Sequence, residues 1–79
     1  MQRFGEKVRT LRKRRRMTTK ELARALGYTN YGYISLIEQG KKIPTVAFVL
    51  KVAHLFNVTA DQLLEDHLEL PDEDIAGGR

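Results

Sequence analysis

The feature that most constrains the fold is a pair of helix-start signals. Thr18 is followed three residues later by Glu21, and Thr59 is followed at the same spacing by Gln62. Each pair is a capping box, in which two side chains satisfy free backbone N–H groups in the first turn of a helix. Two such signals in a chain of 79 residues predict a fold made of several short helices.

Stop signals separate these helical segments. Gly27 and Gly40 follow apolar helical patterns, and Gly27 is expected in the left-handed conformation that commonly ends a helix. Asn57 is expected to take the same conformation after a later helix. Pro44 disfavours a helical conformation at the residue before it, and Thr45 can cap a new helix. The segment "KKIPT" is therefore expected to be a loop.

Apolar residues recur at helical spacing within the segments. Phe4, Val8 and Leu11 follow an i, i+4, i+7 pattern, which places them on one stripe of a helix. The five expected helices span residues 3–15, 18–27, 30–40, 46–56 and 59–64. The side chains expected to face inward in the second, third and fourth helices are Leu22, Ala23, Leu26, Ile34, Ile37, Val46, Val49, Leu50, Ala53 and Phe56. No segment alternates as a strand does, so we predict an all-α, compact five-helix bundle.

The length and composition fit one small domain. A chain of 79 residues with 42% hydrophobic residues can build a single modest core. We expect residues 1–70 to form the domain. Residues 71–79 contain "DEDIAGGR", which has almost nothing to bury, and are expected to be a flexible, disordered acidic tail.

Several function classes find no support in the sequence. The chain has no cysteine, and its two histidines, His54 and His67, are not at metal-ligand spacing, so no metal or cofactor is expected. The longest apolar run, Val46–Leu50, is far too short for a membrane span. No nucleophile–base pair and no phosphate-binding glycine loop is visible, so we do not expect an enzyme.

The charge is distributed unevenly along the chain. Residues 1–16 carry a net charge of +7, residues 17–58 carry +3, and residues 59–79 carry −6, which together give the total of +4. A basic body with an acidic end favours a polyanion as the partner of one face.

Three segments together carry a resemblance to a known family. "MTTKELARALG", "YISLIEQGKKIPT" and "VLKVAHLFNVTADQLL" resemble, in this order, the Cro/λ-repressor-like, or Xre-type, helix-turn-helix domain. The resemblance covers about Phe4 to Leu64. The chain departs from the family pattern by one extra residue after Gly27, so its turn between the second and third helices is longer or its third helix starts later.

The resemblance implies a fold, a function and a location. The second and third helices are expected to form the helix-turn-helix. The chain is expected to be a sequence-specific regulator of transcription that binds double-stranded DNA, acting as a dimeric repressor on a palindromic operator in the prokaryotic cytoplasm or nucleoid. The resemblance also implies an ion pair between Arg12 and Glu38 that fastens the third helix to the first. Residues 13–16 are then either a solvated face or neighbours of DNA phosphates. A protein-interaction module on the same fold, such as an antitoxin or adaptor, is the alternative.

The third helix supplies most of the expected DNA contacts. With Ile34 and Ile37 facing the core, a different set of residues faces outward. The expected base contacts are Asn30, Tyr31, Gly32, Ser35 and Leu36. The expected phosphate contacts are Thr19, Tyr33, Gln39, Lys41 and Lys42.

Some of these residues can instead have a purely structural role. Asn30 can cap the third helix instead of contacting a base, and Leu36 can be an ordinary exposed leucine or meet a partner. Tyr33 can pack against the first helix, and Tyr28 can close the turn as a hydrophobic staple. The three tyrosines do not fall on one stripe of the helix, so a buried aromatic cluster is not expected.

The C-terminal part of the domain is richer in leucine than its share of the core requires. The expected dimer interface consists of Leu55, Leu63, Leu64 and Leu68. The alternative is that these leucines only complete the core of the monomer.

Overall fold

The computed structural model of the chain describes residues 1–72. Within these residues it contains five helices and no strand. The helices are α1 (Phe4–Arg14), α2 (Thr19–Leu26), α3 (Gly32–Glu38), α4 (Val46–Phe56) and α5 (Ala60–Leu64). The prediction of an all-α five-helix fold is therefore confirmed. Of the predicted tail at 71–79, residues 73–79 lie outside the described residues.

The predicted capping signals define the helix ends. The Thr18 side chain accepts a hydrogen bond from the backbone of Glu21 while the Glu21 side chain accepts one from Thr18, and the second capping box at α5 closes in the same way. Thr45 caps α4 through the N–H of Phe48. Gly27 and Asn57 both take the left-handed conformation, with φ of 84° and 54°. These helix ends are thus fixed by residues a few positions apart in the sequence.

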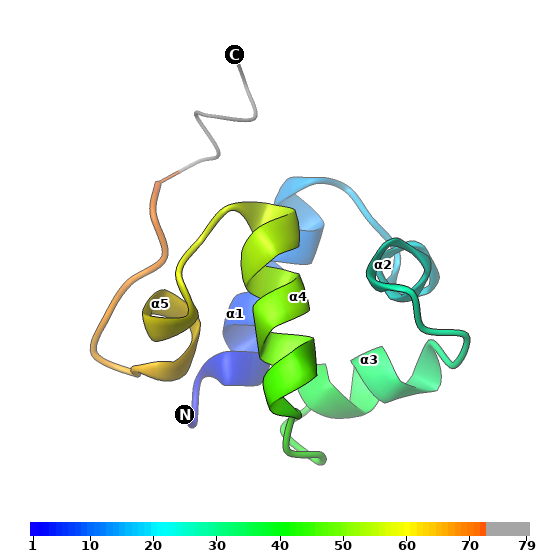
Figure 1. The fold of residues 1–79 in the computed structure, drawn as a ribbon, viewed down its shortest axis with the longest axis horizontal. Helices are drawn as coiled ribbons and strands as arrows, with labels where there is room; N and C mark the ends of the chain where they lie inside the picture. Colours follow the sequence, from blue (N-terminus) through cyan, green and yellow to red (C-terminus); the bar gives the residue numbers. More distant parts are fainter. Residues whose placement is uncertain (73–79) are drawn as a thin grey trace.

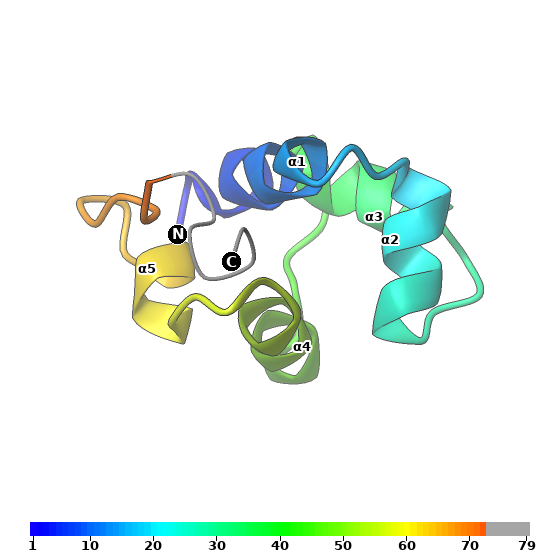
Figure 2. The ribbon, with the colours of Figure 1, turned by 90° about the horizontal axis from the view of Figure 1, so that it is seen from above.

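The helices are arranged around two central ones. Figure 1 shows α4 across the middle with α1 behind it, and Figure 2, seen from above, shows α1 and α4 on opposite sides of the molecule. The pair α2–α3 lies at one end, and α5 lies at the other. Helix α3 is packed against both α1 and α2.

The core is formed by apolar residues from all five helices. Its buried members are Phe4, Val8, Leu11, Leu22, Ala23, Leu26, Ile34, Ile37, Phe48, Val49, Val52, Ala53, Phe56 and Leu63. The sequence-based orientation of α4 was partly wrong. Val46 and Leu50 were expected inside but are 76% and 47% exposed, whereas Phe48 and Val52 are fully buried. Apolar residues surround most of this helix, so periodicity could not identify which side its neighbours cover.

Two tyrosines and two phenylalanines pack together, which corrects the expectation that no aromatic cluster forms. The ring of Phe48 lies 5.3 Å from that of Tyr33, 5.7 Å from that of Tyr28 and 6.2 Å from that of Phe4. Tyr33 therefore packs against Phe48 of α4 and against Tyr28, whereas the structural interpretation of this residue placed it against the first helix. The helical angle of Tyr33 on α3 could not show that the turn folds Tyr28 back toward α4. Tyr31 stays apart and is 52% exposed.

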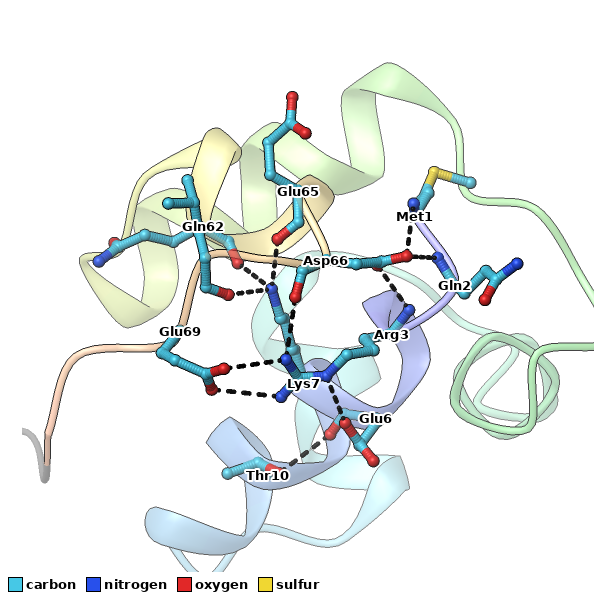
Figure 3. Close-up of polar contacts among 11 residues, drawn as sticks. Met1, Gln2, Arg3, Glu6, Lys7, Thr10, Gln62, Glu65, Asp66 and Glu69 are labelled. Atoms are coloured by element: carbon cyan, nitrogen blue, oxygen red, sulfur yellow. Dashed lines mark hydrogen bonds and ion pairs between the residues drawn. The ribbon is translucent and has the colours of Figure 1, made fainter.

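The segment after α5 is fastened to α1 by a buried lysine (Figure 3). Lys7 is only 1% exposed, and its ammonium group donates hydrogen bonds to the backbone carbonyls of Gln62, Glu65 and Leu68 at 2.6, 2.9 and 2.7 Å. Three donors thus meet three acceptors near the C-terminal end of α5, where helix carbonyls lack partners within the helix.

The N-terminus of α1 is held by the same segment. The carboxylate of Asp66 accepts hydrogen bonds from the backbone N–H groups of Arg3 and Gln2, each at 2.9 Å, and so acts as a helix cap supplied from the other end of the domain (Figure 3). These bonds, the one from Arg3 first, lower the pKa of Asp66 to about 2. The Arg3 guanidinium also bonds to Glu69, which lowers the pKa of that carboxyl group.

Two further arginines of the basic run make contacts across the fold. Arg14 donates a hydrogen bond to the carbonyl of Pro71, and Arg15 donates one to the carbonyl of Leu55. The guanidinium of Arg15 also lies 4.8 Å from the centre of the Phe56 ring. Part of the basic run therefore holds the domain together.

Candidate nucleic-acid interface

Helix α3 is buried on one side and exposed on the other. Ile34 and Ile37 are buried in the core, at 0% and 1% exposure, where α3 packs against α1 and α2. On the outer side, Leu36 is 40% exposed, Gln39 is exposed and Ser35 is half-buried. A short helix with a fixed inner side and an open outer side is a shape that can enter the major groove of DNA.

The start of α3 lies two residues later than expected, at Gly32 instead of Asn30. The side-chain oxygen of Asn30 accepts a hydrogen bond from the N–H of Gly32 at 2.9 Å. Of the two roles considered for Asn30, the structure thus shows a cap-like one, and this bond leaves the amide NH2 group available. The turn between α2 and α3 runs from Gly27 to Tyr31, and its Tyr28 packs on the aromatic cluster.

Arg12 and Glu38 form the expected ion pair between α1 and α3. The guanidinium donates two hydrogen bonds to the carboxylate, at 2.7 Å and 3.0 Å, and a third to the carbonyl of Met17 at 2.7 Å. Both side chains are mostly covered, with 12% and 6% of their surfaces exposed. One guanidinium therefore connects α1, the α1–α2 turn and the C-terminal end of α3.

A glycine lets α1 approach the same end of α3 closely. A Cβ atom placed on Gly5 would collide with the backbone oxygen of Ile37 and would lie 2.8 Å from that of Glu38. Only a residue without a side chain fits against these carbonyls. Gly5 and the ion pair together set the position of α3 on α1.

The residues expected to contact phosphates lie at both ends of the helix-turn-helix. Lys41 and Lys42 are exposed in the loop after α3, and the ammonium of Lys42 lies 6.0 Å from the centre of the Tyr33 ring. Thr19 is the first residue of α2 and is half-buried. Tyr33 is half-buried in the aromatic cluster.

The expected dimer interface needs one correction. Leu63 is fully buried in the core of the monomer and cannot contact a second copy in this conformation. Leu55 and Leu64 are partly buried against the core, and Leu68 is also partly covered. The side chain of Leu63 points inward because α5 packs against both α4 and α1.

Sequence reasoning missed the residues that position α1. Lys7 and Gly5 were not singled out, although a signal was present for Lys7. It lies three residues after Phe4 and four before Leu11, which places its stem on the apolar side of the helix. The role of Gly5 had no signal, because it depends on which helix packs on α1.

Two negative findings concern the described residues. None of the helices within 1–72 is both long enough and apolar enough to span a membrane. The same residues contain no group of three or more acidic, histidine or cysteine side chains that could hold a metal ion.

Comparison with known proteins gives consistent results. A family model described as a helix-turn-helix domain matches residues 3–68. The N-terminal DNA-binding domain of SinR from Bacillus subtilis superposes on the chain with a TM-score of 0.76 at 27% identity, covering 87% of this chain and all of that one.

Two curated proteins of Bacillus subtilis (strain 168) are also similar. The uncharacterized HTH-type transcriptional regulator YazB is 32% identical over 60 residues, which is 76% of this chain and 86% of YazB. The HTH-type transcriptional repressor RghR is 37% identical over 65 residues, or 81% of this chain, and the match spans 47% of RghR. The family match covers all five helices and agrees with the structural superposition, so the chain belongs to the helix-turn-helix domain family.

Proposed function

We propose that this protein is a sequence-specific regulator that binds double-stranded DNA and represses transcription, with α3 in the major groove. The family consists of regulators without enzymatic activity, so the chain is not an enzyme. The observation that carries the proposal is the placement of α3, whose isoleucines are buried while its outer side is free. Similarity to the DNA-binding domain of SinR and to the transcriptional repressor RghR supports DNA binding and repression.

The residues of the exposed surface divide into two roles. Asn30, Tyr31, Gly32, Ser35 and Leu36 would meet base edges, where an amide can pair with adenine and an apolar group can touch a thymine methyl. Thr19, Tyr33, Gln39, Lys41 and Lys42 would bind the sugar-phosphate backbone, which orients the domain without reading sequence. We place this activity in the prokaryotic cytoplasm or nucleoid, where operator DNA is found.

We further propose that two copies bind one palindromic operator. A single module has few base contacts, each worth only about 1–3 kcal/mol of discrimination. The molecule measures 30 × 26 × 18 Å, so two copies fit side by side on half-sites about 34 Å apart. Leu55, Leu64 and Leu68 would contribute to the interface between the copies.

The alternative is a protein-interaction module on the same fold. Leu36 and Tyr31, at 40% and 52% exposure, favour it because exposed apolar groups also suit a protein surface. The salt dependence of binding separates the two functions. Affinity for DNA falls with salt by a slope of about −0.9 per neutralised phosphate, whereas an apolar protein contact responds weakly.

Selection from random duplex DNA tests the proposed function. We expect enrichment of a palindromic site with half-sites about one helical turn apart. The selected duplex is then titrated with protein over a range of salt concentrations, and a steep negative slope is expected. Failure to enrich any sequence, together with weak binding that ignores salt, would reject the DNA-binding regulator.

A further inference from the structure

Four exposed apolar side chains take no part in the proposed DNA contacts. Within residues 1–72, the large apolar residues that are strongly exposed are Met1, Tyr31, Leu36, Ile43, Val46 and Leu50. Tyr31 and Leu36 are assigned to base edges, and the other four have between 47% and 77% of their surfaces exposed. Single exposed apolar residues are common, but a group of them in one place marks an interaction surface.

The four residues lie close to one another around the start of α4. Met1 and Ile43 line the same hollow, which has a volume of about 270 Å³. Ile43 lies in the loop two residues before Thr45, the cap of α4. Val46 and Leu50 follow on α4 itself, one helical turn apart and therefore on the same side of the helix. We call Met1, Ile43, Val46 and Leu50 the apolar stripe.

No other helix of the described residues covers the side of α4 that carries Val46 and Leu50. Helix α4 packs against α2 and α5, and α1 lies behind it in Figure 1. In Figure 2, none of the described helices lies beyond α4 on the side turned away from α1. Residues 40–57, which include this side, contain no aspartate or glutamate. A second apolar surface can therefore pack here without burying a carboxylate of α4.

The two flanks of this open side carry opposite charges. Figure 1 shows α2 on one flank of α4 and α5 on the other. On the α2 flank, the ammonium of Lys51 lies 4.7 Å from the centre of the ring of Tyr28, which belongs to the turn after α2. On the α5 flank, Asp61 and Glu65 are both exposed. Within residues 1–72, Asp61 forms no ion pair, and Glu65 pairs only with His67, at 3.9 Å.

A surface with opposite charges on its two flanks can be complementary to a copy of itself. A two-fold axis lying along α4 brings the α5 flank of one copy over the α2 flank of the other, so that carboxylates meet a cation. The same axis leaves both α3 helices at one end of the pair, because a rotation moves nothing along its own axis. In Figure 1, α3 and the α3–α4 loop lie at the N-terminal end of α4. Both α3 helices can therefore reach one duplex.

The leucines expected at the interface leave its centre open. Leu63 is buried, and the other three leucines are half-buried, so they can add only to its margin. We propose that a second copy of this chain packs on the apolar stripe with the two-fold axis along α4. This inference rests on the proposed function, in which two copies bind one operator. Val46 and Leu50 of each copy then pack against their own counterparts.

Disulfide cross-linking tests which surfaces meet, because the chain has no cysteine of its own. Val46→Cys and Leu50→Cys are each oxidised with copper phenanthroline in air, with and without the palindromic duplex obtained by selection. Both positions lie along the proposed axis, so each variant should form a covalent dimer through its single cysteine. Thr10→Cys, on the exposed side of α1, is the matched control and should remain monomeric. A dimer linked at only one of the two α4 positions would overturn the proposed axis, because an axis across α4 brings only one position close to its counterpart.

Charged substitutions test what the stripe contributes to binding. Val46→Glu and Leu50→Glu alter side chains that already contact solvent, so both variants should fold, which circular dichroism checks. We expect their affinity for the palindromic duplex to fall by about tenfold or more, because the gain from linking two modules is lost. Their affinity for a duplex with one half-site should be unchanged. Thr10→Glu adds the same charge on α1 and should bind both duplexes as the wild type does.

The failure of this inference differs from the failure of the proposed function. If both glutamate variants bind the palindromic duplex as Thr10→Glu does, and neither α4 cysteine forms a dimer, no second copy covers the stripe, and DNA binding by the wild type still stands. A wild type that sediments as one copy on the palindromic duplex likewise overturns the inference. If the wild type shows no salt-dependent binding to DNA, the proposed function is rejected, and the cross-links formed without DNA decide separately whether two copies pair on the stripe.

Discussion

At the scale of single residues, the position of the DNA-facing helix depends on Glu38. Its carboxylate receives two hydrogen bonds from Arg12, and both groups are largely covered. Removing one partner of a covered ion pair costs more than removing both, because the remaining charge loses its compensation.

We therefore predict that Glu38→Ala lowers the free energy of unfolding by about 3 kcal/mol and also weakens DNA binding. Urea unfolding and anisotropy measure the two effects. Glu6→Ala is the control, because Glu6 pairs with Arg3 at an exposed position and such pairs contribute about 1 kcal/mol or less. A stability of Glu38→Ala equal to that of the control would contradict the structural role of the pair.

Lys7 is a second single residue on which the stability of the fold depends, because its ammonium group donates hydrogen bonds to three backbone carbonyls away from solvent. In Lys7→Met the apolar stem is kept but the three carbonyls lose their donor. We predict a loss of about 3 kcal/mol in the free energy of unfolding, since each buried polar group without a partner costs about 1–3 kcal/mol. Denaturant unfolding measures it, with Lys13→Met as the exposed control; equal stabilities of the two variants would show that the carbonyls find other donors.

At the scale of helices, the contact between α1 and α3 sets the orientation of the interface. Gly5 lies against the backbone oxygens of Ile37 and Glu38, and backbone cannot move aside as a flexible side chain can. A side chain at this position must push the two helices apart.

We predict that Gly5→Ala lowers the free energy of unfolding by about 2 kcal/mol, the usual cost of overpacking, although alanine favours helix more than glycine does. It should also weaken binding to the selected operator, because α3 is displaced. Thermal unfolding measures the stability of Gly5→Ala, and anisotropy measures its affinity for DNA. Arg9→Ala, on the exposed side of α1, is measured in the same way and controls for changes in helix propensity. A Gly5→Ala variant with raised stability and unchanged affinity would mean that the helices are not in close contact.

At the scale of the whole molecule, hydrogen bonds and ion pairs hold the N-terminus of α1 to the segment after α5. Asp66 accepts bonds from Arg3 and Gln2, and its pKa in the folded chain is about 2, against an ordinary value of 3.8. The folded state therefore holds the proton less tightly than the unfolded state. The carboxylate contributes stability above its ordinary pKa, and this contribution is lost as the pH falls from 3.8 toward about 2.

We predict that Asp66→Asn unfolds at a lower temperature than the wild type near neutral pH, and that the two midpoints converge as the pH is lowered toward about 2. Thermal unfolding followed by circular dichroism at a series of pH values measures this. Asp61→Asn, an exposed acid of α5, is the control and should show a smaller difference that changes less with pH. A constant gap between Asp66→Asn and the wild type at all pH values would exclude the carboxylate as its cause.

How much of the fold and of the candidate site could be predicted depends on how far apart in the sequence the interacting residues lie. Both ends of α2 and the start of α5 were predicted from Thr18, Gly27 and Thr59, since caps and stops form between residues a few positions apart. The outer side of α3 was predicted from the periodicity around its two isoleucines. The aromatic cluster and the inner side of α4 were predicted wrongly, because a helix that is apolar on most sides does not reveal which side its neighbours cover.

The sequence by itself determined where α2, α4 and α5 begin, because the backbone groups at those ends are satisfied by the side chains of Thr18, Thr45 and Thr59, which are close along the chain. Only the tertiary structure decided that Lys7 would be buried, that Asp66 would cap a helix about sixty residues away, and that Gly5 would lie against α3. These roles belong to pairs of segments. No local pattern can specify them, because their partners come together only when the core closes.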